Sequence, residues 1–468
     1  MKGFLTKKSL KVKLHYKLLE IEHMKNIAIL GAGRSSSSLI RYLLAQSEQM
    51  DWKIRVCDFN LETAKQKINN HKNGEAMEFD VFDHAEVEKE VSNADLIVSM
   101  LPARMHIHVI EEAIKQKKSV VTPSYISPEV KALDEAAKEA GILIMNELGV
   151  DPGIDHMSAM KLLNEIREDG GEILNFESFT GGLVAPESDN NPWNYKFTWN
   201  PRNVVVAGQG GPAKFIEEGQ YKYIPYNKLF RRTEFINIDG YGKFEGIANR
   251  DSLKYQSIYN LENIRTIYRG TLRRVGFARA WDVFVQIGAT DDSYEMENTE
   301  EMTYRDFINS FLSYDKTDSV ELKLRHYLKI EQDDTLWEKL VWLGIFEDKK
   351  IGLKNATPAQ ILQKILEDKW TLEPEDKDMI VMWHKIIFNN KAGERKEIHS
   401  SMVSVGEDQT YTAMSNTVGL PVGICCKLIL DGTIKATGVQ MPIDKEFYLP
   451  ILKELEAYNI SFSEKAIN

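Results

Sequence analysis

The chain has 468 residues, of which 43% are hydrophobic, so it can bury a sizeable core and is long enough for two or three domains. Its formal net charge of −11 argues against broad nucleic-acid binding, because little of the surface would offset phosphate charge. No run of about 18 consecutive apolar residues is present, so we predict no transmembrane helix.

Residues 1–23 carry six lysines and two glutamates and lack the apolar core of a signal peptide. Met24 directly precedes the first strand-like run. We therefore predict that residues 1–23 are a disordered extension or a start-site artefact. A short lysine-rich helix is the alternative.

Residues 24–151 alternate short apolar runs with helical stretches, which predicts a parallel sheet with helices on both faces. Ser127 and Pro128 are typical of a helix start. The expected fold class is α/β, with a Rossmann-type doubly wound sheet. The expected strands are 26–30, 53–58, 76–80, 95–101, 119–122 and 142–147, and the expected helices are 36–46, 61–69, 105–116 and 128–140.

After residue 151 the pattern changes to α+β. Asp151-Pro152-Gly153 opens a helix, with Asp151 placed to cap it. Strand-like runs follow at 176–180 and 204–206, separated by loops rich in Gly, Pro and Asn. We expect a substrate-binding domain made of residues 152–294 with 376–468.

Residues 295–375 are helical and charged, and Trp337 and Trp342 are the expected core anchors. This segment predicts an all-helical insertion in the α+β domain. Strand character returns near residues 380–388, and the largely apolar segment 411–430 predicts a buried helix. A C-terminal helix is expected to pack back on the first domain, residues 24–151.

The loop Gly31-Ala32-Gly33-Arg34-Ser35-Ser36 resembles a dinucleotide phosphate loop. Gly31 permits the tight turn, and Gly33 lets the backbone approach a pyrophosphate at a helix N-terminus. Arg34 and Ser35 could add phosphate donors. An ordinary strand–turn–helix is the alternative for the loop alone, but the alternating context favours dinucleotide binding.

Asp58 ends the second predicted strand. A carboxylate there can accept hydrogen bonds from the ribose hydroxyls of NAD and would repel the 2′-phosphate of NADP. We therefore predict NAD as the cofactor, with NADP as the alternative. The three cysteines, Cys57, Cys425 and Cys426, show no metal-ligand spacing, so we predict no metal site and a reducing cytoplasm.

Motifs spread over residues 24–460 match one known family. They are SMLP at 99–102 with His106, VTPSYISP at 121–128, MNELGVDPGIDH at 145–156, GGLVAPE at 181–187, NP at 191–192, YKFTW at 195–199, NRDS at 249–252, RGTLR at 269–273, TVGLP at 417–421 and LDGTI at 430–434. The chain resembles the glutamate-forming saccharopine dehydrogenases, also called saccharopine reductases, far more than the lysine-forming ones.

This resemblance implies a reaction. Saccharopine, NAD(P)⁺ and water give L-glutamate, 2-aminoadipate 6-semialdehyde and NAD(P)H. Asp58 matches NAD-using animal members, whereas NADP-using fungal members have an arginine nearby. The residue therefore favours NAD and the degradative direction of lysine metabolism.

The resemblance also implies substrate contacts. Saccharopine carries three carboxylates, a primary amine and a secondary amine, so its site needs several cations. Arg250 and Arg273 fit as bidentate carboxylate clamps, with structural or solvated ion pairs as the alternative. Thr271 and Leu272 would add hydroxyl and backbone contacts beside Arg273, and Ser124 would lie at the crevice formed by the strand ends.

Hydride leaves the carbon beside the secondary amine, and that amine must lose its proton first. Asp151 and Tyr125 are the proposed catalytic residues, and both would also contact substrate. His106 is a third candidate base, although a structural role is the more common one, and His156 is equally ambiguous. The residues expected to contact the dinucleotide are Gly31, Ala32, Gly33, Arg34, Ser35, Asp58, Asp80, Leu101, Pro123, Ser124, Val150, Pro152 and Trp199.

Two other functions stay open. One is a carboxynorspermidine-type dehydrogenase on the same scaffold, which would handle fewer carboxylates and depend less on Arg250. The other is a non-catalytic NAD-binding regulator, which has no need for a multi-carboxylate clamp. We expect a small-molecule substrate, no nucleic-acid or membrane partner, and a monomer or homodimer.

Overall fold

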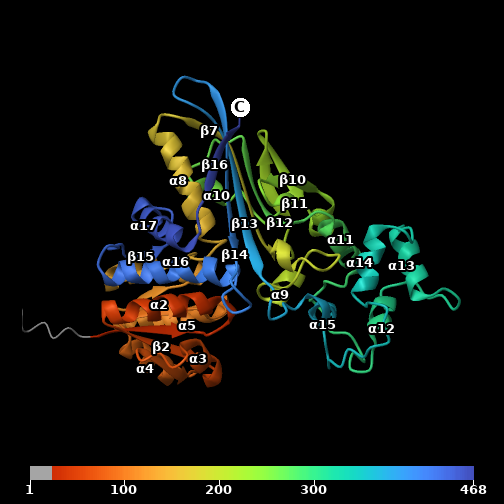
Figure 1. Cartoon of the computed structure of the whole chain (residues 1–468), viewed down its shortest axis with the longest axis horizontal. Helices are drawn as coiled ribbons and strands as arrows, with labels where there is room; N and C mark the ends of the chain where they lie inside the picture. Colours follow the sequence, from red (N-terminus) through yellow and green to blue (C-terminus); the bar gives the residue numbers. More distant parts are fainter. Residues whose placement is uncertain (1–23, 468) are drawn as a thin grey trace, which may run out of the picture. The chain divides into compact units, whose positions relative to one another are not determined.

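The computed structural model describes residues 24–467 (Figure 1), so the prediction for residues 1–23 lies outside the described residues. The described chain divides into two compact units. The first unit contains residues 24–147 and 422–440, and the second contains 148–421 and 441–467.

The first unit is built on a parallel sheet, which in the described part of the chain has seven strands in the order β15-β6-β5-β4-β1-β2-β3. The strand order reverses beside β1, as in a doubly wound fold, where ligands bind at the carboxyl ends of the strands. All six predicted strands are present, and β15 completes the edge. The bounds are β1 Lys25–Leu30, β2 Trp52–Asp58, β3 Gly74–Glu78, β4 Leu96–Ser99, β5 Ser119–Val121, β6 Leu143–Met145 and β15 Gly438–Gln440.

Helices join these strands, and their apolar faces pack in a core with Leu30, Ile97 and Val120. The predicted helix at 128–140 is two short helices, because the chain tightens at Leu133, whose N–H bonds the Val130 carbonyl three residues back. The bounds are η1 Arg34–Ser36, α2 Ser37–Met50, α3 Leu61–Ile68, α4 His84–Asn93, η2 Ala103–Met105, α5 His106–Gln116, α6 Pro128–Lys131 and α7 Asp134–Ala140.

The second unit is built on a mixed sheet of nine strands, counted over the described residues. Strands β10-β11-β12-β7-β13-β14-β16 lie in that order, with β8 and β9 off this path. The strand β7 pairs parallel with β12 and antiparallel with β13. The bounds are β7 Glu172–Val184, β8 Ala213–Glu217, β9 Gln220–Ile224, β10 Thr233–Ile238, β11 Gly242–Ala248, β12 Thr266–Arg274, β13 Asp378–Asn389, β14 Arg395–Val405 and β16 Ser463–Ile467.

The second unit also contains helices. Among them, the segment 204–206 is not the predicted strand. It belongs to a short helix, because Asn200 caps the turn by accepting from the Arg202 N–H and Pro201 occupies the first helical position. The bounds are α8 Ile154–Glu168, η3 Pro186–Ser188, α9 Pro201–Val205, η4 Tyr226–Arg231, α10 Tyr255–Ile258, α11 Phe277–Ile287, α17 Lys445–Leu455 and η5 Glu456–Tyr458.

The predicted helical segment 295–375 contains α12 Tyr304–Asn309, α13 Val320–Leu328, α14 Thr335–Trp342 and α15 Pro358–Trp370 (Figure 1). Trp337 is buried, and Trp342 packs partly buried against the same core. That core continues through Trp370 to the aromatic side chains beside the sheet, since Trp370 stacks on Trp281. The helices therefore share one core with the second unit.

The apolar segment predicted as a buried helix is α16, Ala413–Leu430, which runs across the boundary between the two units. Asp378 begins it by accepting from the N–H groups of Ala413 and Met414. Among the described residues, this helix alone has the length and composition to span a membrane. Its apolar window is 67% buried inside the protein, as in the core helix of a globular protein.

Candidate active site

The turn after β1 forms the predicted phosphate loop. Gly31 has φ of +102°, and a Cβ on it would lie 3.0 Å from the backbone of Met100, so this position requires glycine. Gly33 has φ of −63°, and a Cβ there would meet nothing within 4 Å. The loop thus leaves open space where η1 and α2 begin, which fits a pyrophosphate.

The serines of this loop hold the turn. Ser36 Oγ donates to the Gly33 carbonyl over 2.8 Å, and Ser37 Oγ donates to the Arg34 carbonyl over 3.2 Å. Ser37 Oγ also accepts from Lys67 Nζ. Arg34 is exposed and Ser35 half-buried, so these two remain the predicted phosphate donors.

Asp58 stands at the end of β2, beside the loop. Its Oδ2 accepts from the Ala32 N–H over 2.7 Å, and its Oδ1 accepts from the Asn60 N–H over 2.9 Å. The carboxylate is therefore fixed at the position predicted to bind ribose hydroxyls. Asp80 follows β3, where its carboxylate accepts from the Phe82 N–H over 2.9 Å.

His106 links the ends of β4 and β5. Its Nδ1 lies 2.7 Å from Ser99 Oγ, and its Nε2 lies 2.7 Å from Ser124 Oγ. Burial lowers the pKa of His106 to about 4, so the ring is neutral near pH 7 and both nitrogens are engaged. The structure thus gives His106 a role in holding Ser124, and Tyr125 follows with 39% of its surface exposed.

The other predicted cofactor residues fall in both units. Leu101 and Pro123 follow β4 and β5 in the first unit. Val150 and Pro152 are buried in the turn before α8, and Trp199 packs partly buried against the core, all in the second unit.

In the second unit, one face of the sheet carries polar side chains. Arg269, Thr271 and Arg273 alternate along β12 and therefore share that face, spread over roughly 13 Å. Ser178 and Thr180 of β7 lie opposite Arg269 and Thr271. The sequence had singled out Thr271 and Arg273 within this group, and the strand brings them onto one surface.

Asp151 joins this face through an ion pair. Arg269 Nη2 lies 3.0 Å from Asp151 Oδ1, and the same nitrogen contacts Asp155 Oδ2. The predicted capping role of Asp151 is wrong, because Gly153 is the N-cap of α8 and its N–H donates to Asp155 Oδ1. Asp151 instead faces Arg269, and its side chain keeps 16% exposure, whereas that of Asp155 has none.

Burial and the neighbouring Asp155 charge raise the pKa of Asp151, and Arg269 opposes that rise. Burial would lower the pKa of Arg269, but the negative charges around it, that of Asp151 first and that of Asp155 among them, together outweigh burial and keep this pKa well above its usual range. Asp151 is thus a carboxyl group whose affinity for a proton is greater than that of an ordinary aspartate.

Arg273 is buried, with 8% of its surface exposed. Its Nη1 donates to the Leu272 carbonyl over 2.8 Å, and its guanidinium lies 5.1 Å from the Tyr195 ring centre. Among the described residues no carboxylate forms an ion pair with it. A buried guanidinium in this state favours an incoming anion.

Two buried hydroxyls lie on the same face. Thr180 Oγ1 and Thr198 Oγ1 have no hydrogen-bond partner within the described part of the chain. Thr198 Oγ1 lies 3.0 Å from the position that a Cβ on Gly182 would take. Such hydroxyls suit a polar ligand beside Arg273.

The remaining predicted substrate residues differ in surroundings. Leu272 is fully buried, and its carbonyl accepts a hydrogen bond from Arg273. Leu272 would therefore affect substrate binding by positioning Arg273. Arg250 is exposed and has φ of +46° in the loop after β11. The neighbouring Asn249 N–H donates to the Arg269 carbonyl, which places this loop beside β12.

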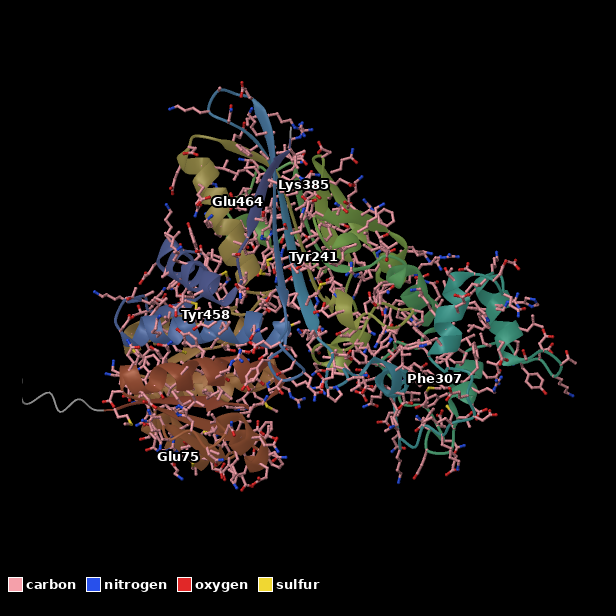
Figure 2. The ribbon with its side chains drawn as sticks, in the orientation of Figure 1. Glu75, Tyr241, Phe307, Lys385, Tyr458 and Glu464 are labelled. Atoms are coloured by element: carbon pink, nitrogen blue, oxygen red, sulfur yellow. The ribbon has the colours of Figure 1, made fainter. Side chains whose placement is uncertain are left out.

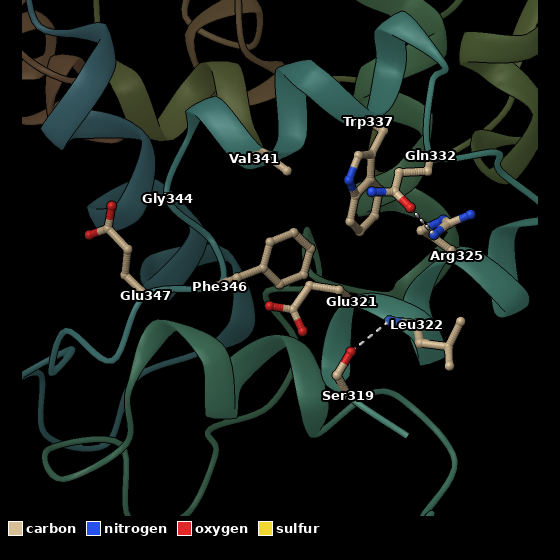
Figure 3. Close-up of a pocket in the computed structure, with 10 residues that line it drawn as sticks. All are labelled: Ser319, Glu321, Leu322, Arg325, Gln332, Trp337, Val341, Gly344, Phe346 and Glu347. Atoms are coloured by element: carbon tan, nitrogen blue, oxygen red, sulfur yellow. Dashed lines mark hydrogen bonds between the residues drawn. The ribbon is translucent and has the colours of Figure 1, made fainter. Parts of the chain in front are cut away.

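Two cavities lie away from these residues. One of about 710 Å³ is in the helical segment between Ser319, Arg325, Trp337 and Phe346 (Figure 3). The other, of about 450 Å³, lies against the opposite face of the sheet, where Lys385 pairs with Glu177. Lys385 is labelled in Figure 2. Neither cavity is lined by a residue that the sequence predicted for the site.

Sequence reasoning missed Arg269 and Asp155, although both lie in the quoted motifs. The available signal was the two-residue spacing of 269, 271 and 273, which puts them on one face of a strand. The pairing of Arg269 with Asp151 spans 118 positions in the sequence, so no local pattern could show it.

Two family models match the chain. The family model described as the saccharopine dehydrogenase NADP binding domain matches residues 27–145, and the saccharopine dehydrogenase C-terminal domain matches residues 149–460. A solved structure of saccharopine dehydrogenase (L-Glu forming) from Saccharomyces cerevisiae superposes with a TM-score of 0.86 at 31% identity. It covers 95% of this chain and 100% of that chain.

Among curated proteins, saccharopine dehydrogenase [NADP(+), L-glutamate-forming] of Pyricularia oryzae is 35% identical over 95% of this chain and 99% of its own length. The mitochondrial alpha-aminoadipic semialdehyde synthase of Mus musculus is 31% identical over 96% of this chain, which spans 48% of that longer protein. The fold class and dinucleotide binding predicted from the sequence are confirmed. The chain belongs to the saccharopine dehydrogenase family.

Proposed function

We propose that this protein is an NAD(P)-dependent saccharopine dehydrogenase of the L-glutamate-forming type, working in lysine degradation. It would oxidise saccharopine with water to L-glutamate and 2-aminoadipate 6-semialdehyde. The observation that carries the proposal is the polar sheet face of the second unit. It combines Asp151, a carboxyl group of raised pKa that keeps exposed surface, with a buried Arg273 that has no carboxylate partner among the described residues.

The first unit would hold the dinucleotide. The open space at Gly33, the exposed Arg34 and the fixed Asp58 carboxylate fit a pyrophosphate followed by a ribose. These residues would hold a nicotinamide dinucleotide, which would supply the hydride acceptor. Asp58 favours NAD, although the fungal relatives are named as NADP(+) enzymes, so both cofactors belong in the test.

The second unit would hold the substrate. Arg273 would bind one carboxylate through charge-assisted hydrogen bonds, with Thr271 beside it, and the exposed Arg250 would bind another. Asp151 would take the proton from the secondary amine, so that the carbon next to nitrogen can release hydride. Water then adds to the resulting imine, and the C–N bond breaks to release glutamate and the semialdehyde.

Tyr125 and Ser124 would contribute further contacts from the end of β5, where His106 fixes the serine. The alternative substrate, a carboxynorspermidine, is not favoured by the relatives. The three cysteines of the described chain are free and buried, in keeping with the cytoplasmic location we propose. A monomer or homodimer acting on a small molecule remains our expectation.

The decisive experiment follows NAD(P)H formation with purified protein, saccharopine, and NAD or NADP in parallel, with carboxynorspermidine as the matched alternative substrate. Rapid reduction with saccharopine alone supports the proposal. Turnover of carboxynorspermidine in its place would transfer the assignment to the polyamine enzyme. Dinucleotide binding with neither turnover would leave only the regulator.

A further inference from the structure

We propose that Arg269, held in place by Asp155, is a positioning residue that fixes the orientation and charge of Asp151. The inference rests on the proposed role of Asp151 in proton transfer. It starts from the arrangement of three charges, in which one guanidinium nitrogen contacts both carboxylates. Asp151 is the one carboxylate of this pair that keeps exposed surface, so it is the member a substrate can reach.

Arg269 cannot swing away from the pair. Its guanidinium carbon lies 3.9 Å from the Tyr255 ring centre, and its side chain has 6% exposure. Its backbone is held on both sides, because the N–H donates to Ser252 Oγ over 3.0 Å and the carbonyl accepts from Asn249. A charge fixed on a strand in this way gives Asp151 one defined geometry.

Asp155 is fixed as firmly. Its side chain is fully buried, and its Oδ1 accepts from the Gly153 N–H over 2.6 Å at the start of α8. A helix N-terminus favours a negative charge. Asp155 therefore competes with Asp151 for the single positive charge of Arg269, and the two neighbours act on Asp151 in opposite directions.

The other titratable groups near this cluster are His156 on α8, Tyr255 and Tyr259 on and after α10, and His384 on β13. His156 Nδ1 lies 2.6 Å from the Tyr259 hydroxyl and 3.7 Å from Asp155 Oδ2. His384 contacts Ser158 and Ser178, and burial lowers its pKa to about 3. Burial raises the pKa of Tyr259 far above its usual range. His156 is the histidine that lies close to a carboxylate of the cluster, so the experiment includes a variant of His156 as a control.

The experiment is the pH profile of kcat/KM for saccharopine. Activity is lost at low pH once Asp151 is protonated. Arg269→Gln removes the attracting charge, so the acid limb should move upward by about one pH unit or more. Asp155→Asn removes the repelling charge, so the limb should move downward. Arg269→Lys keeps the charge and should restore most of the wild-type position.

If Arg269 and Asp155 control the pKa of Asp151, the acid limb of the pH profile moves in opposite directions in Arg269→Gln and Asp155→Asn. If the two residues are only structural, kcat falls in both variants and the limb does not move in opposite directions. Shifts in the same direction, or none, overturn the inference. The variant Asp151→Asn separates this failure from that of the proposed function, since a limb that persists without Asp151 shows that another group titrates. His156→Asn should move the limb less than Arg269→Gln does, because the effect of His156 on the pKa of Asp151 is smaller than that of Arg269.

Folding of each variant is checked by its melting temperature and its affinity for NADH. If Arg269→Gln does not fold, Arg269→Lys and Asp155→Asn still test the prediction. In that case we expect the acid limb of the pH profile to move little in Arg269→Lys and clearly downward in Asp155→Asn.

Discussion

The sites that we propose in the two units are built by different means. The first unit uses backbone: a turn of glycines and helix N–H groups within residues 31–37, completed by the Asp58 carboxylate. The second unit uses side chains drawn from distant positions, as in the pairing of Asp151 with Arg269. A phosphate site can therefore be predicted from a short sequence motif. A site for a multiply charged substrate cannot, because it depends on which strands become neighbours in the fold.

The largest expected effect comes from the second unit. Arg273→Met removes a buried cation that would hold a substrate carboxylate, so kcat/KM for saccharopine should fall by a factor of about 10² to 10³. Arg274→Met is the matched control, because Arg274 donates to the Tyr241 carbonyl on the other face of β12. Equal losses in both variants, measured by steady-state kinetics, would contradict the assignment of Arg273.

The next effect separates the two glycines of the first unit. Gly31→Ala forces a side chain into positive φ and against the Met100 backbone, which should destabilise folding by roughly 1–3 kcal/mol. Gly33→Ala meets only open space, so the melting temperature should stay close to that of wild type while NADH binds more weakly. Thermal unfolding and fluorescence titration measure the two effects. A large loss of stability in the Gly33 variant would contradict the assignment of Gly33 to an open phosphate site.

Substitution of Asp58 tests whether one side chain determines the preference for NAD over NADP in the first unit, where the proposed phosphate site is otherwise made of backbone. Asp58→Arg replaces a carboxylate that would repel a 2′-phosphate with a cation that would attract it. The ratio of kcat/KM values for NAD and NADP should therefore shift toward NADP by about tenfold or more. A wild-type enzyme that already prefers NADP would overturn the interpretation of Asp58.

The smallest effect concerns acid stability. Burial lowers the pKa of His384 to about 3 in the folded protein, whereas an unfolded histidine titrates near 6.5. The stability tied to neutral His384 is therefore present above about pH 6.5 and is lost as the pH falls toward 3. His384→Gln should flatten the dependence of the free energy of unfolding on pH over this range.

The sequence predicts the elements that depend on local patterns better than the contacts that depend on distant residues. The six strands of the first unit and the buried helix at 411–430 were predicted because apolar periodicity is local. The segment 204–206 was misassigned because its valines favour strands, while Asn200 and Pro201 started a helix. Asp151 was given a capping role because nothing in its neighbourhood in sequence shows Arg269.

The discontinuous first unit bears on how the protein is made. Its parallel sheet ends with β15, which pairs with β6, yet β15 leaves the ribosome about 290 residues after Glu147. At roughly 5–20 residues per second, β6 spends some 15–60 seconds of synthesis with one edge paired to β5 and the other edge unpaired. Unpaired strand edges invite association with other chains, so the nascent protein is most prone to aggregation before Gln440 emerges.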